Sequence, residues 1–147
     1  MARHKKTLIC TLLLVVLLLS TALPALAAST TAVMYLPSLC QWASTPVVTR
    51  SGSHGSLNTY VGSVYPAAGG TDTLTTVVCR VYDSSFQNIV TRKSQYTFVE
   101  GVPLPANTDD HDFWIKDGYF LTYYDLVFQY RSVTQDAARA VITYDAK

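Results

Sequence analysis

The chain has few of the residues from which catalytic and metal sites are usually built. It contains three histidines, three cysteines and a single glutamate, and only 14% of its residues are charged. It has no clear amphipathic helix, and no apolar run beyond Ala27 is long enough to span a bilayer. The scarcity of histidine, cysteine and glutamate disfavours a catalytic or metal-binding protein. The lack of an amphipathic helix disfavours a helical fold.

The segment 1–27 has the three parts of a secretory signal peptide. A basic start, MARHKK, precedes an almost purely apolar run, 8–23, and the small residues Ala25-Leu26-Ala27 follow. The alternative is an uncleaved membrane anchor, but the run is short of the roughly 20 residues that a spanning helix needs. We therefore expect cleavage after Ala27 and secretion of residues 28–147 as a single domain.

The expected mature chain is slightly acidic. Removing residues 1–27 takes away three basic residues and no acidic one, which leaves eight basic and ten acidic residues. No basic patch is left to attract nucleic acid, so we expect no nucleic-acid partner. A membrane is expected to be contacted only by the signal segment before cleavage.

Two cysteines, Cys40 and Cys79, survive removal of the signal peptide. An even, small number of cysteines in an exported chain suggests a disulfide, although two buried thiols are the alternative. They lie too far apart along the chain to form a CxxC redox motif. We expect a Cys40–Cys79 bond that ties the N-terminal segment to the strand containing Cys79.

The mature chain has the rhythm of an all-β domain. Short runs rich in Val, Thr and Tyr alternate with Gly, Ser, Asn, Asp and Pro, which predicts a single antiparallel β-sandwich. The expected strands are 31–36, 46–50, 56–65, 73–82, 88–99, 119–131 and 139–145, with an interruption of 88–99 near Lys93 as an alternative. About seven short strands and one disulfide resemble the immunoglobulin-like layout, as an architecture and not as a family.

Strand 73–82 has a readable core face. Val77, Cys79 and Val81 fall on one side of an extended strand, and we expect that side to face inward. The turn at 83–85 then leads back toward 88–92, which predicts a hairpin.

The segment 119–131, YFLTYYDLVFQYR, is the most informative. Its even positions form a nearly continuous apolar face, which we assign to the core: Phe120, Tyr124, Leu126, Phe128 and Tyr130. Its odd positions begin with Tyr119, Leu121 and Tyr123, which would then face outward. One strand over the whole segment would be unusually long, and a bulge near Asp125 would reverse the facing of one half.

No local signature supports catalysis or metal binding. Ser53 or Ser56 with His111 and Asp110 would make a triad only on paper, because no nucleophile elbow is present. The acidic loop residues Asp109, Asp110 and Asp112 are the best candidates for Ca²⁺, but they match no cation-binding pattern. We expect a solvated loop there, and neither a cofactor nor a metal.

The favoured function is a non-catalytic secreted module that binds an extracellular glycan or protein. Exposed aromatic rings stack on sugars, and we expect Trp114, Tyr119 and Tyr123 to contact the ligand. One alternative is an inhibitor-like or structural protein that acts through its loop 101–114, and a small secreted hydrolase is a third. A glycan-binding module would show a flat, exposed aromatic row on one sheet, whereas the loop-based alternative would not.

Overall fold

The computed structural model describes residues 29–50, 55–69, 73–103, 113–117 and 123–146. These residues form strands and turns and contain no helix, so the all-β prediction is confirmed. The strands are β1 (Thr30–Leu36), β2 (Ala43–Ser44), β3 (Val48–Thr49), β4 (Leu57–Pro66), β5 (Thr76–Asp83), β6 (Tyr96–Val99), β7 (Asp125–Ser132) and β8 (Ala138–Ala146). The expected signal peptide lies outside these residues, and within them no helix is long and apolar enough to cross a membrane.

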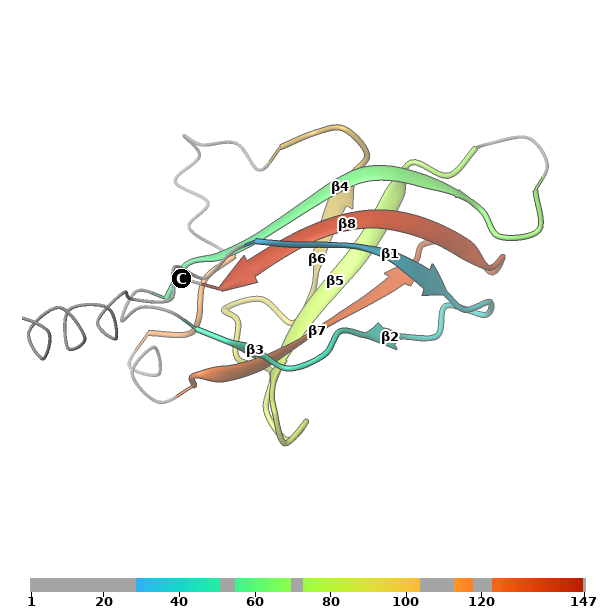
Figure 1. Ribbon diagram of the computed structural model, residues 1–147. Coiled ribbons are helices and arrows are strands. Elements are labelled where there is room, and N and C mark those ends of the chain that lie inside the picture. Colours follow the sequence, from blue (N-terminus) through green and yellow to red (C-terminus); the bar gives the residue numbers. More distant parts are fainter. Residues whose placement is uncertain (1–28, 51–54, 70–72, 104–112, 118–122, 147) are drawn as a thin grey trace, which may run out of the picture.

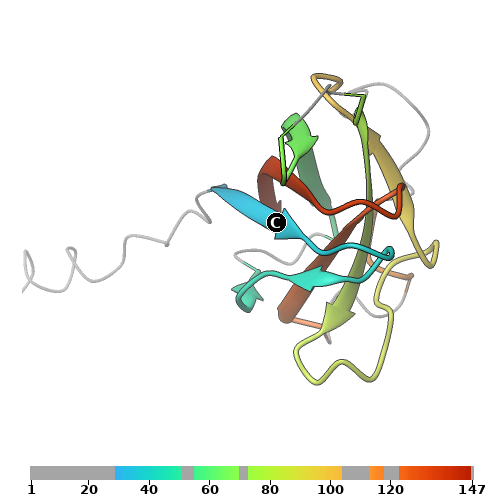
Figure 2. The same cartoon turned by 90° about the vertical axis from the view of Figure 1, so that its right-hand side faces the viewer.

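The strands form two antiparallel sheets, shown face-on in Figure 1 and turned by 90° in Figure 2. One sheet has three strands in the order β1-β8-β4. The other has five strands: β7 pairs with both β2 and β3 on one side and with β5 on the other, and β6 pairs with β5. Several consecutive strands, such as β4 and β5 or β7 and β8, belong to different sheets, so their connecting turns gather at the ends of the domain.

Four expected strands are confirmed with small shifts at their ends. The expected strands 31–36, 56–65, 73–82 and 139–145 correspond to β1, β4, β5 and β8. Segments 46–50, 88–99 and 119–131 contain shorter strands than expected, and β2 was not expected. The seven-strand immunoglobulin-like layout is not confirmed, because eight strands are described and the last of them lies between β1 and β4. The hairpin expected at 73–92 is present in short form, since Tyr82 bridges Ile89 and Val90 N donates to Val81 O.

The core lies between the two sheets. As expected, Val77, Cys79 and Val81 of β5 point inward and are fully buried. They meet inward side chains from both sheets: Leu36, Val61, Val64, Ala140, Ile142, Tyr144, Leu126, Phe128 and Tyr130. Apolar burial of this kind is the main source of stability in a domain of this size.

One lateral side of the domain is closed by the only glutamate in the chain. Val64 N of the edge strand β4 donates to Glu100 Oε2 at 3.2 Å, and Gly101 N donates to Val61 O at 2.8 Å. Because Glu100 directly follows β6, these bonds join an edge of one sheet to an edge of the other. A sheet edge tied in this way is protected from pairing with another chain.

The expected disulfide does not form. Cys40 and Cys79 are both free thiols. Cys79 projects into the core, where burial raises its pKa well above the ordinary value and Tyr130 and Thr59 lie beside it. Cys40 lies in the turn after β1, with a positive φ of 55°, and its thiol points at Thr134 O, 3.4 Å away. The alternative of two buried thiols holds for Cys79 but not for Cys40, which is only partly buried.

Candidate functional site

The three residues expected to bind a ligand do not make one exposed platform. Tyr119 lies outside the described residues. Trp114 is half-buried and bridges Ser56 at the start of β4. Tyr123 is half-buried and packs against the core instead of facing outward.

The facing of the segment before β7 is the reverse of the expected one. Leu126, Phe128 and Tyr130 point inward as expected, but Tyr124 is 47% exposed. Arg50, the residue after β3, bonds to the backbone of both tyrosines at this point. Arg50 N donates to Tyr124 O at 2.8 Å and its Nη1 donates to Tyr123 O at 3.0 Å. The bond to Tyr124 continues the register in which Thr49 lies opposite Asp125, so the change of facing occurs close to where a bulge was considered, without a register shift between β3 and β7.

Other sequence-derived candidates add no site in the described part of the chain. His54, His111 and the acidic residues Asp109, Asp110 and Asp112 lie outside the described residues. Among the residues that are described, no cluster of three or more His, Cys, Asp or Glu side chains could hold a metal ion.

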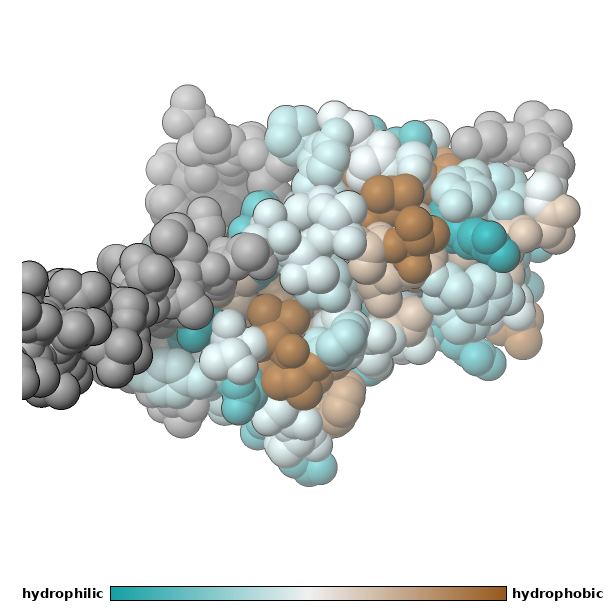
Figure 3. Space-filling view, viewed as in Figure 1, coloured by the Kyte–Doolittle hydropathy of each residue, from teal (hydrophilic) through white to brown (hydrophobic). Residues whose placement is uncertain are grey.

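An exposed aromatic row is found on the outer surface of the three-stranded sheet. Val33 and Tyr35 of β1 are 62% and 56% exposed, and Tyr60 and Tyr65 of β4 are each 37% exposed. We call this surface the tyrosine face; its residues are Thr31, Val33, Tyr35, Tyr60, Ser63, Tyr65, Arg139, Val141 and Thr143. Figure 3 views it from the front and shows hydrophobic atoms over β1 and β8, flanked by paler, more polar ones.

The strand register aligns these residues in three rows across the sheet. Tyr35 and Tyr65 both lie opposite Arg139. In the next row Val33 and Ser63 flank Val141, and in the third Thr31 and Tyr60 flank Thr143. Neighbours in a row are about 4.5–5.5 Å apart at Cβ, so the exposed side chains form one continuous surface.

A bulge in β4 is what brings both of its tyrosines to this face. The register shifts between Val61 and Ser63, so that Gly62 is an extra residue. In a regular strand, Tyr60 and Tyr65 would point to opposite faces because they are an odd number of positions apart. The extra residue resets the alternation, which leaves Val61 and Val64 fully buried while both tyrosines point out.

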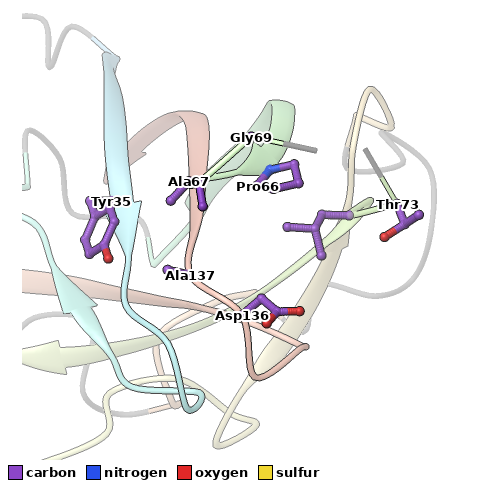
Figure 4. A pocket seen from close by; sticks show the side chains of 9 residues that line it. Tyr35, Pro66, Ala67, Gly69, Thr73, Asp136 and Ala137 are labelled. Carbon is purple, nitrogen blue, oxygen red and sulfur yellow. The ribbon is translucent and has the colours of Figure 1, made fainter. Parts of the chain in front are cut away.

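A hollow of about 500 Å³ opens at the end of the tyrosine face (Figure 4). Tyr35 lies on one side of it and Thr73 on the other, with Asp136 between them. The remaining wall comes from the turn after β4 and the turn before β8: Pro66, Ala67, Ala68, Gly69, Leu74 and Ala137. Tyr35 therefore belongs both to the aromatic row and to the hollow.

The tyrosine face and the hollow together combine two kinds of contact. The flat aromatic rings offer apolar surface with a hydroxyl at the tip, which suits a ligand that is apolar on its face and polar at its rim. Arg139 supplies hydrogen-bond donors, and Asp136 supplies acceptors at the mouth of the hollow.

The tyrosine face was missed from the sequence because its residues come from three strands far apart along the chain. The segment Tyr60-Val61-Gly62-Ser63-Val64-Tyr65 carries the only local signal. A glycine inside a strand pattern indicates a bulge, and here the valines and tyrosines are placed symmetrically about the Gly62–Ser63 pair. The chain matches no known protein family, no curated protein and no solved structure, so its function has to be argued from this geometry.

Proposed function

We propose that the protein is a secreted, non-catalytic module that binds an extracellular glycan through the tyrosine face. The observation that carries the proposal is the row Tyr35–Arg139–Tyr65, which runs across three strands to the mouth of a hollow. Two exposed rings with a hydrogen-bonding group between them fit the alternation of C–H faces and hydroxyl groups along a sugar chain.

A glycan fits this surface better than a protein partner does. The centre of a protein–protein interface is apolar and well packed, with tyrosine and arginine enriched and serine depleted. The exposed Arg139 at the centre of the aromatic row therefore fits either kind of partner, and the small polar residues around the row make the difference. The polar residues Thr31, Thr143 and Ser63 also interrupt the apolar surface, as expected where a ligand offers many hydroxyl groups.

The proposal also covers the layout of the two sheets and the secretion of the protein. We infer that the two sheets form a β-sandwich related to the immunoglobulin-like layout only in its general plan. The expected signal peptide supports secretion after cleavage at Ala27. The small-hydrolase alternative is weakened because Glu100, the one glutamate, bonds to the backbone of β4.

The test is a binding screen against neutral polysaccharides and cell-wall fractions, by affinity electrophoresis and then calorimetry. For the best polysaccharide, we expect Tyr35→Ala and Tyr65→Ala each to weaken binding by about tenfold or more, as truncation of a central aromatic contact does. The matched control is Tyr124→Ala, because Tyr124 is also an exposed tyrosine but lies before β7, away from this face.

The result that contradicts the proposal is equal binding by all three variants and the unchanged protein. Loss of binding in Tyr124→Ala alone would move the site to the other sheet. Thermal melts of each variant show whether a loss of binding reflects a loss of folding.

A further inference from the structure

The outer surface of the five-stranded sheet carries two arginines beside one tryptophan. Arg80 and Tyr82 of β5, Gln129 and Arg131 of β7, and Trp42 just before β2 form this surface, which we call the arginine face. Arg80 lies directly opposite Gln129, which in turn lies opposite Ser44.

The Arg80 guanidinium is held on three sides. Its Nε donates to Gln129 Oε1 at 2.8 Å, and Gln129 Nε2 donates in turn to Ser44 Oγ at 2.9 Å. Its carbon Cζ lies 4.0 Å from the centre of the Trp42 ring and 5.0 Å from that of Tyr82. A guanidinium fixed by stacking and by its Nε keeps its two terminal nitrogens as a pre-oriented fork.

A second guanidinium shares the same tryptophan. Arg131 Cζ lies 5.1 Å from the Trp42 ring centre, and its Nη1 donates to Ser132 O at 3.3 Å. Within the described residues neither arginine has a carboxylate partner, since the ion pair found there joins Arg92 to Asp117. Two like charges gathered on one aromatic ring, with no acidic residue of the described chain against them, form a local excess of positive charge on an otherwise slightly acidic mature domain.

We propose that the arginine face binds the carboxylate groups of an acidic polysaccharide, with Arg80 as the main contact and Arg131 as the second. A carboxylate matches the planar fork of an arginine, which can bind both of its oxygens at once. This site lies on the sheet opposite the tyrosine face, so it extends the proposed function with a second site and does not depend on the first.

A polysaccharide fits better than an acidic peptide does. Peptides dock on sheets chiefly by pairing with an exposed strand edge, or by placing side chains in pockets. Arg80 and Arg131 project from β5 and β7, which are inner strands of this sheet, so a peptide could pair only with the short edge strands β2, β3 and β6 and not with the strands that carry the arginines. A flexible peptide would also lose backbone entropy for each residue that it orders on binding, a loss that a stiffer polysaccharide avoids in part.

The experiment measures binding of polygalacturonic acid to the purified protein by calorimetry, with its fully methyl-esterified form as the uncharged comparison. We expect binding of the acidic polymer alone, weakened by salt between about 50 and 200 mM. We expect Arg80→Gln and Arg80→Lys each to weaken it by about tenfold, because lysine keeps the charge but loses the fork. Arg131→Gln should weaken it less.

The matched control is Arg92→Gln, which removes a partly exposed arginine that belongs to neither face and pairs with Asp117. Unchanged binding in this variant supports the proposal, whereas equal losses in Arg80→Lys and Arg92→Gln would show an unspecific charge effect and overturn it. Equal or tighter binding of polyglutamate would instead assign the site to acidic proteins, and no binding of either polymer would also refute it. The two proposals are tested separately. If Tyr35→Ala and Tyr65→Ala leave the binding of neutral glycans unchanged, the proposal for the tyrosine face fails, but the expected binding of polygalacturonic acid at the arginine face does not change.

Discussion

The outer faces of the two sheets follow the same alternation of side chains, but they differ in how far their outward apolar residues are covered by neighbouring side chains. On the tyrosine face, Val33 and Tyr35 are left more than half exposed. On the arginine face, Val78 and Val127 also point away from the core, yet both are buried. Their cross-strand neighbours are Arg131 and Tyr82, whose long side chains lie over the sheet together with Trp42.

This difference separates a surface that the chain covers itself from one that it leaves open. Arginine stems and aromatic rings shield apolar residues while their polar ends reach water. The arginine face therefore has a structural role besides the proposed binding role. The tyrosine face has no such cover from the described residues, and this exposed apolar surface is the reason that we propose it as the binding site.

The largest expected effect comes from the core that separates the two faces. Phe128 is fully buried and lies 5.5 Å from Tyr144 of the opposite sheet, measured between ring centres. We expect Phe128→Ala to lower the free energy of unfolding by about 3–5 kcal/mol, as measured by urea denaturation. A loss below about 1 kcal/mol would mean that the two sheets do not share this core.

The next effect sharpens the comparison of the two faces. Trp42→Ala removes the ring on which both arginines stack, and we expect a loss of about 1–3 kcal/mol. Tyr35→Ala removes an exposed ring, and we expect a change within about 0.5 kcal/mol. Parallel urea titrations give both values. Equal destabilisation by the two substitutions would remove the distinction between a covered face and an open one.

A smaller effect concerns the two tyrosines before β7. Tyr123 packs against the core, so Tyr123→Ala should lower the free energy of unfolding by about 1–2 kcal/mol. Tyr124→Ala should change it by no more than about 0.5 kcal/mol, because that ring is exposed apart from its contact with Arg50. A larger loss for Tyr124→Ala than for Tyr123→Ala would contradict this account and support the regular alternation expected from the sequence.

The smallest expected effect is a pH dependence at the end of β5. Partial burial raises the pKa of Asp83, but hydrogen bonds from Asn88, Ser85 and Gln87 outweigh it and hold the pKa below its ordinary value of 3.8. A lowered pKa in the folded state stabilises the protein above pH 3.8, and this contribution is lost as the pH falls through the folded-state pKa. Thermal melts between about pH 5 and about pH 2 should therefore show a shallower decline for Asp83→Asn than for the unchanged protein.

The sequence predicted those parts of the fold that depend on local alternation. Val77, Cys79 and Val81 identified the core face of β5, and Leu126, Phe128 and Tyr130 that of β7. Alternation is a property of a single strand, so it survives without knowledge of the partner strands.

The sequence failed where distant residues change the local pattern. Tyr123 packs against the core and Tyr124 is exposed at the point where Arg50, from the distant segment after β3, bonds to both of their carbonyl oxygens. The Cys40–Cys79 bond was inferred from the even number of cysteines and from the expected secretion of the chain. A disulfide also requires that the two cysteines lie next to each other in space. The tyrosine face depends on the register of three strands, which no single segment reveals.

The most direct test of the central claim is to locate the glycan on the folded protein. Backbone amide chemical shifts, recorded by nuclear magnetic resonance during titration with an oligosaccharide from the best neutral polysaccharide, report the contact residues. The account predicts that the largest changes cluster at Tyr35, Tyr65, Arg139 and the turn around Asp136. Changes confined to 101–114, or to β5 and β7, would contradict it.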